Sequence, residues 1–357
     1  MQPPTATPSA PARRRLGPRT AVLLVVLAVA SAELALARMG YGNPRLVRTD
    51  ATRGYALVGE QVVQGPHGSE ERINALGFRE RDWRDAPPGR PLVVVLGHSV
   101  SYGVGVDAAE RWTAQLEAAL RAGAASGACV LDLAVPGYTL EQMLAVQAEV
   151  ARPLAPDVVV VELGDYSIRP MTRADEPEDY PLSRWIRRSA LFDFWRRKRG
   201  VLRRDQGLVA RVLEDPGAPE VEGLWQAAFA RLEALREELS ARGARLVLLH
   251  TPRATAALEP AAAPSRWSEW CAAHPDVLEL DCAPALGARM RPLAEELARR
   301  GVDPRLPRGR LARLDPDDFE RREDACFFLD DLQHLTPLGH GVVGAQVAAA
   351  LAPLLAE

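Results

Sequence analysis

The sequence predicts an α/β protein: a three-layer α/β/α sandwich around a mostly parallel sheet of five strands, preceded by a hydrophobic helix. Two observations predict this fold. From residue 91 onward, short apolar runs alternate with segments of helical periodicity, as is typical of parallel strands joined by helical crossovers. The run Leu92–Leu96 holds five consecutive apolar residues, which indicates a strand buried on both faces.

The predicted elements follow one another in chain order. Strands are expected at 91–96, 129–133, 157–163, 245–250 and 276–280. Helices are expected at 108–123, 139–153, 221–242, 286–300 and 338–354. Together they predict one large domain over 91–357, with insertions at 168–220 and 301–325, where the alternation of strands and helices is interrupted.

The first ninety residues have a different character. Residues 1–19 are rich in proline, alanine and arginine and are predicted to be a disordered basic N-terminus. Residues 20–38 form an apolar run behind these arginines, which indicates a signal anchor or a signal peptide. Residues 39–90 are expected to be a linker and irregular extension, with a short hairpin strand within 58–63. The domain is therefore expected outside the cytoplasm, attached to the membrane by this helix (periplasmic or at the cell surface), or secreted if the signal is cleaved.

Composition excludes several classes of function. A net charge of −3 carries no basic signature of nucleic-acid binding. The segment Gly103–Gly105 lacks the third glycine of a dinucleotide-binding motif, and no Gly-Lys-Ser/Thr follows a strand. The four cysteines show no metal-ligand spacing. Cys271 and Cys282 could pair across a short loop, and free buried thiols are the alternative. We therefore expect no cofactor, no metal and no nucleic-acid partner.

Two segments carry candidate chemistry. Ser99 follows a buried strand where the chain turns toward a helix, which puts its hydroxyl at the carboxyl edge of the sheet, where open α/β sheets bind ligands. Asp331 and His334 are three residues apart and share one face of a turn. A carboxylate there can fix the imidazole tautomer and leave its other nitrogen free as a base. The simpler alternatives are a serine that caps a turn and an exposed histidine beside an acid.

The other histidines are expected to be structural. His340 is expected to pack against the sheet rather than react. His67, His250 and His274 are likewise expected to be structural.

These motifs resemble those of the SGNH (GDSL-type) hydrolase family, over about residues 90–354. Gly97–Gly103 resembles the block G-D-S-x-x-x-G, with His98 in place of the aspartate. Leu131–Tyr138 resembles the second block, with Gly137 as its glycine, and Asp331–His334 resembles the block D-x-x-H. The segment Asn74–Arg79 resembles what precedes the domain in anchored bacterial members.

The resemblance implies a flavodoxin-like fold and a Ser-His-Asp triad. By position, Ser99 would be the nucleophile, His334 the general base and then acid, and Asp331 its orienting partner. The oxyanion donors would be the backbone N–H groups of Ser99 and Gly137.

The third block departs from the family pattern. Where the family has G-x-N-D, with an asparagine that donates to the oxyanion, this chain has Gly164-Asp165-Tyr166-Ser167. Tyr166 occupies the position of the asparagine, and its hydroxyl could replace that donor only if the backbone shifted. Losing one such donor typically costs about 10²–10³ in kcat.

The predicted function is an extracytoplasmic serine esterase that cleaves an acyl or acetyl ester through an acyl-enzyme. Its expected partner is an ester-bearing small molecule or a polysaccharide. Two alternatives stay open: an O-acyltransferase of the same fold that acts on a polysaccharide, and a non-catalytic SGNH-like binding protein.

Overall fold

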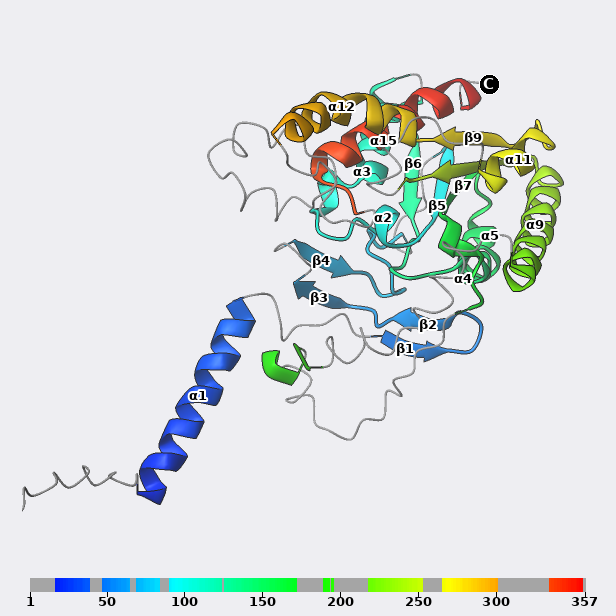
Figure 1. Ribbon diagram of the computed structural model, residues 1–357. Coiled ribbons are helices and arrows are strands. Elements are labelled where there is room, and N and C mark those ends of the chain that lie inside the picture. The colour runs from blue at the N-terminus through cyan, green and yellow to red at the C-terminus, as the bar shows by residue number, and fades with distance from the viewer. Residues whose placement is uncertain are drawn as a thin grey trace, which may run out of the picture.

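The fold is a parallel sheet between two layers of helices, with two small hairpins and an N-terminal helix added (Figure 1). The computed structural model describes residues 17–38, 47–64, 69–83, 90–123, 125–171, 189–192, 194–195, 218–252, 265–300 and 334–355. The predicted insertion at 301–325, as well as Asp331 and Cys326, lies outside these residues.

The central sheet has five parallel strands in the order β6-β5-β7-β8-β9. In chain order they are β5 (Leu92–Leu96), β6 (Cys129–Asp132), β7 (Val158–Leu163), β8 (Arg245–His250) and β9 (Leu278–Asp281). All five coincide with predicted strands, and the parallel five-stranded sheet is confirmed. Because the chain crosses over β5 between β6 and β7, the order of strands reverses beside β5, which is where ligands bind in such sheets.

Successive residues of each strand face opposite layers, because side chains alternate along a strand. Val93 and Val95 belong to one core, and Val94 and Leu96 to the other. Core residues of the first layer come from α3 (Trp112–Ala122), α12 (Ala283–Arg299) and α15 (Pro337–Leu354). Core residues of the second come from α4 (Leu140–Val146), α9 (Pro219–Ser240) and α11 (Arg266–Ala272). The three-layer sandwich is therefore confirmed.

Shorter helical segments complete the domain. They are α2 (Ser99–Tyr102), η2 (Ala108–Glu110), the π-helical turn η3 (Gln147–Ala151), α5 (Arg152–Leu154) and η4 (Asp165–Ile168). Each of the five long helices expected from periodicity is present, with ends that differ by a few residues. Most of the insertion predicted at 168–220 lies outside the described residues, and α9 begins at Pro219.

The described residues 47–64 and 69–73 form two antiparallel hairpins rather than an irregular extension. Strand β1 (Val47–Asp50) pairs with β2 (Gly54–Leu57), and β3 (Gln61–Gln64) pairs with β4 (Glu70–Ile73). The strand expected within 58–63 corresponds to β3. The prediction of an irregular segment was wrong here because four-residue strands are too short for their periodicity to stand out. Leu57 and Ile73 nevertheless belong to the same core as the helices α4 and α9.

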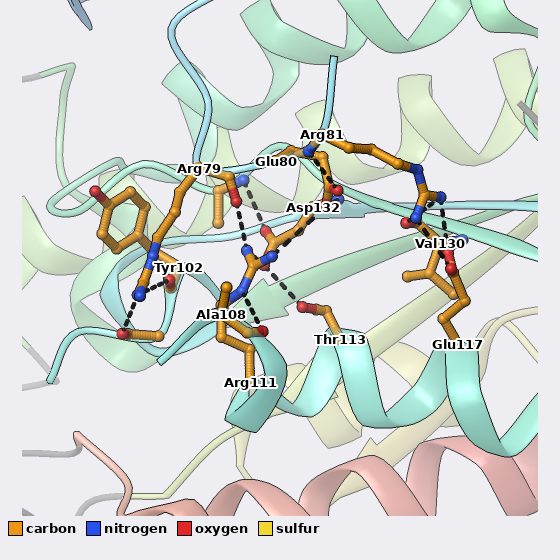
Figure 2. A network of polar contacts seen from close by, with 12 residues as sticks. Arg79, Glu80, Arg81, Tyr102, Ala108, Arg111, Thr113, Glu117, Val130 and Asp132 are labelled. Carbon is orange, nitrogen blue, oxygen red and sulfur yellow. Dashed lines mark hydrogen bonds and ion pairs between the residues drawn. The ribbon is translucent and has the colours of Figure 1, made fainter. Parts of the chain in front are cut away.

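Arg79 fastens this N-terminal extension to the segment that carries Ser99 (Figure 2). Its buried guanidinium donates to the carbonyls of Tyr102 (3.3 Å), Gly103 (2.6 Å) and Val106 (2.7 Å). It also donates to the carbonyl of Glu70 at 2.9 Å, on β4. One side chain thus joins the second hairpin to the end of α2 and the loop after it.

Two further arginines tie the extension to β6 and α3 (Figure 2). Arg111 donates to the carbonyl of Arg79 at 2.7 Å and to Asp132 at 3.1 Å. Asp132 is buried at the end of β6 and also accepts from the Thr113 hydroxyl at 3.0 Å. Arg81 forms a two-point contact with Glu117 on α3, at 3.0 and 2.7 Å. The extension is thus an integral part of the domain.

Two helices of the described chain are long and apolar enough to cross a membrane. One is α1 (Pro18–Arg38), with a mean hydropathy of 2.3 and no buried residue. The other is α15, which packs against α3 and contributes Val343 and Leu351 to the core. Burial explains the composition of α15, whereas α1 has the length and composition of a signal anchor or signal peptide.

Three of the cysteines are described, and all three are buried free thiols. Cys271 lies in α11 and Cys282 directly after β9, so the disulfide considered for this pair is not formed. Burial raises the pKa of the Cys271 thiol to about 12 and that of Cys282 further. Both therefore behave as small apolar core residues.

Candidate active site

The turn after β5 places Ser99 at the carboxyl edge of the sheet. Gly97 ends the strand, His98 is the N-cap residue of α2, and half-buried Ser99 is its first residue. A Cβ on Gly97 would lie 2.6 Å from Glu162 Oε2 and 2.7 Å from the Ser101 hydroxyl, so only glycine fits. The structure thus has Ser99 at the carboxyl edge of the sheet, where the sequence predicts it.

Glu162 is the centre of the contacts that hold this turn. It lies near the end of β7 and is fully buried. Its Oε2 accepts the backbone N–H groups of His98 (3.2 Å) and Ser101 (2.9 Å), and its Oε1 accepts the Thr251 hydroxyl (2.9 Å). Oε1 is also 3.3 Å from Nε2 of His98. A buried carboxylate is stable only with such partners, and here they fix the backbone on both sides of Ser99.

His98, which stands where the family has aspartate, is a neutral imidazole in this site. Burial lowers its pKa, and the nearby charges of His334 and Arg169 lower it further, whereas Glu162 opposes them. The neutral ring can do two things at once. Its Nδ1 accepts the N–H of Val100 at 3.5 Å, as an N-cap acceptor, while Nε2–H faces Glu162. With both nitrogens engaged in the interior, His98 serves to shape the turn.

The second-block glycine lies beside this turn. A hydrogen bond of 3.2 Å from the Val135 N–H to the Gly97 carbonyl joins the loops that follow β6 and β5. Gly137 has φ +86°, a left-handed conformation that favours glycine. Among the described residues, the N–H groups of Ser99 and Gly137 take part in no hydrogen bond. Two backbone donors on adjacent loops are therefore available for a ligand oxygen.

His334 lies immediately before α15, whose N-cap residue Thr336 accepts the N–H of Gly339 at 3.2 Å. The charge of His334 contributes to the lowered pKa of both His98 and His340. Among the described residues, no hydrogen bond joins the Ser99 hydroxyl to the His334 ring. Such contacts are often long without substrate. The triad itself stays a prediction.

The third block, which departs from the family pattern in sequence, follows β7 as a short helical turn. The backbone of Tyr166 lies in η4, directly after β7, but its side chain is outside the described part of the chain. Ser167, in the place of the family's aspartate, is buried and its hydroxyl accepts the Gly164 N–H at 3.0 Å. The short side chain of Ser167 therefore closes the turn. The role of Tyr166 as an oxyanion donor stays a prediction.

The remaining described histidines have structural partners. His340 is buried against the start of α3, where its Nδ1 accepts the N–H of Trp112 at 3.2 Å. His250 and His274 face Glu279 (3.5 Å) and Glu233 (3.0 Å), carboxylates on other elements. Within the described residues, no group of three or more His, Cys, Asp or Glu is placed to hold a metal ion.

His340 predicts a specific acid sensitivity of the fold. Burial, with the charges of Arg111, Arg79 and His334, lowers its pKa to about 3, against about 6.5 in an unfolded chain. Between these values only the unfolded state binds the proton, so the free energy of unfolding falls as pH falls, by about 1.4 kcal/mol per pH unit.

His340→Gln is expected to remove this part of the slope. Urea unfolding at several pH values between 4 and 7 measures it in both proteins. Parallel stability curves for the two would contradict the assignment.

Sequence reasoning missed two residues of the site. Glu162 lies within a predicted apolar strand, although an acid inside a run of buried valines is itself a signal, because burial of a charge requires partners. Tyr55, on β2, donates to the carbonyl of Pro136 at 2.7 Å and so contacts the Gly137 turn. No local pattern marks this tyrosine, since its partner is 81 residues away.

The five-stranded parallel sheet carries a serine at the turn after its first strand, with a glycine turn on the adjacent loop and a histidine directly before α15. This is the arrangement of an SGNH-type α/β hydrolase. The sequence profile of the GDSL-like Lipase/Acylhydrolase family matches residues 95–342. This match covers more than half of the chain, and the protein belongs to that family.

Solved structures of low identity resemble the chain. Axe2, an acetylxylan esterase from Geobacillus stearothermophilus, is 14% identical with a TM-score of 0.41, over 74% of this chain and 94% of its own. A lipase/acylhydrolase from Enterococcus faecalis is 14% identical with a TM-score of 0.39, over 74% and 96%. TesA is 21% identical with a TM-score of 0.26, and the match spans 44% of this chain and 59% of TesA. No curated protein matches the sequence.

Proposed function

We propose that the protein is a serine esterase that cleaves an acyl or acetyl ester through an acyl-enzyme. Ser99 Oγ attacks the ester carbonyl, and His334 takes the serine proton and then gives it to the leaving alcohol. Asp331 holds the His334 ring in the required tautomer. A water molecule, activated by the same histidine, then releases the acid and restores Ser99.

One observation carries this proposal: two unused backbone N–H groups, of Ser99 itself and of Gly137 on the adjacent loop, lie at a half-buried serine. Donors in such a position stabilise the negative oxygen that develops during acyl transfer. The family to which the chain belongs supports the same chemistry.

We place the esterase outside the cytoplasm, with α1 as a membrane anchor. Four arginines precede or begin this helix, and positive residues ahead of an apolar run favour this orientation. The large exposed side chains of α1, such as Val22 (64% exposed) and Val25 (63% exposed), suit a lipid environment.

A fluorophosphonate probe tests the proposal directly. The folded full-length protein in detergent is expected to form a covalent adduct, which peptide mass spectrometry maps to Ser99. Hydrolysis of 4-nitrophenyl acetate should be abolished by the same treatment. Folded protein that neither reacts nor hydrolyses esters would support the non-catalytic alternative, which the absent third-block asparagine favours. Faster turnover with an added polysaccharide acceptor would instead indicate an acyltransferase.

A further inference from the structure

We propose that Tyr55, on the N-terminal hairpin β1–β2, is a positioning residue that aims the Gly137 N–H at the substrate oxygen. This inference rests on the proposed esterase site. It makes a segment that precedes the matched family region, residues 95–342, a part of the catalytic apparatus.

The first step is the fixed position of the hairpin. The buried side chain of Gln142, on α4, donates to the Arg53 carbonyl at 2.7 Å, and Arg53 Nε lies 3.3 Å from Glu149. The rings of Tyr55 and Tyr138 pack edge to face, with centroids 5.1 Å apart. The start of β2 is therefore held against α4 and the second-block loop, and Tyr55 approaches that loop from a rigid base.

The second step is a reciprocal pair of hydrogen bonds, here called the tyrosine clamp. The Tyr55 hydroxyl donates to the Pro136 carbonyl at 2.7 Å, and the Tyr138 hydroxyl donates to the Tyr55 carbonyl at 2.7 Å. The first bond ends on the peptide group between Pro136 and Gly137. The second ends on the hairpin and does not involve that peptide.

The third step is the geometry of a peptide group. The Pro136 carbonyl and the Gly137 N–H belong to one planar trans unit, in which they point in opposite directions. Fixing the oxygen at one end therefore fixes the direction of the N–H at the other. A donor to the carbonyl also polarises the unit and makes its N–H a stronger donor.

Contact at the glycine itself supports the assignment. A Cβ on Gly137 would lie 2.9 Å from the Tyr55 hydroxyl oxygen, which among the described residues, chain neighbours aside, is the one heavy atom within 4 Å of that point. Glycine is therefore required at this position for two reasons: the positive φ and the close approach of the Tyr55 hydroxyl. Since the third-block asparagine is absent, stabilisation of the oxyanion depends more on the two backbone donors. The direction of the Gly137 N–H therefore matters more for the rate.

The test compares Tyr55→Phe with Tyr138→Phe in the full-length protein. Each removes one hydroxyl of the clamp and keeps both rings, but only Tyr55→Phe frees the Pro136–Gly137 peptide. Tyr55→Phe is expected to lower kcat and the rate of fluorophosphonate labelling by about tenfold to a hundredfold, with KM changed less than about twofold. Tyr138→Phe should lose similar thermal stability but less than about threefold in kcat.

Equal losses of kcat in the two variants, or a Tyr55→Phe enzyme as fast as the wild type, would overturn the inference. Hydrogen–deuterium exchange of the segment 135–139 provides a readout that is independent of activity. Exchange there should be faster in Tyr55→Phe than in Tyr138→Phe, and equal exchange counts against the inference. If the wild-type protein shows no esterase activity, the proposed function fails, and the exchange result alone decides whether Tyr55 orders this peptide.

Discussion

Ser99→Ala is expected to abolish fluorophosphonate labelling and to reduce ester hydrolysis by about five to six orders of magnitude. The reason is that no acyl-enzyme can form without the hydroxyl, while the N–H groups of Ser99 and Gly137 continue to bind the substrate oxygen. His334→Ala should be comparably severe, because the attacking hydroxyl then has no base. Labelling rates and kcat, measured on folded protein, give both effects.

Ser101→Ala provides the matched control. Ser101 lies two residues further along the same short helix, is buried, and its hydroxyl makes no hydrogen bond within the described part of the chain. Its N–H, which Glu162 accepts, is retained in the variant. We expect kcat within about threefold of the wild type. An adduct on another residue, or normal labelling of Ser99→Ala, would remove Ser99 from the nucleophile role.

Glu162→Ala is expected to destabilise the protein by several kcal/mol, at about 1–3 kcal/mol for each buried donor that loses its acceptor. The substitution leaves the N–H groups of His98 and Ser101 and the Thr251 hydroxyl buried without their acceptor. Since the first two of these flank Ser99, the proposed nucleophile should also shift. A misplacement of about 1 Å can cost about a hundredfold in rate.

Chemical denaturation and labelling kinetics measure these two effects separately. Thr251→Val is the control, because it removes a single bond of Glu162 and leaves its contacts with His98 and Ser101 intact. It should cost only about 1 kcal/mol and leave the labelling rate near that of the wild type. A Glu162→Ala protein with an unchanged denaturation midpoint would show that the turn is held by other contacts.

Local sequence determined the strands of the central sheet and the helices that cover it. Apolar runs such as Leu92–Leu96 and Val158–Val161 mark strands because a sheet covered on both faces buries most of its side chains. The position of Ser99 at the carboxyl edge, and of His334 ahead of α15, followed from the same alternation of elements. The hydrophobic helix at the N-terminus was equally visible from composition.

The tertiary structure alone decided how the Ser99 turn and the Gly137 turn are held. His98 and Glu162 are 64 residues apart, and Tyr55 and Pro136 are 81 apart. Contacts between such distant residues leave no periodicity in the sequence, because either partner by itself reads as an ordinary polar residue in its own segment. Only in the folded chain do Glu162, an acid inside a strand, and Tyr55, in a four-residue hairpin strand, come to contact the turns of the same candidate site.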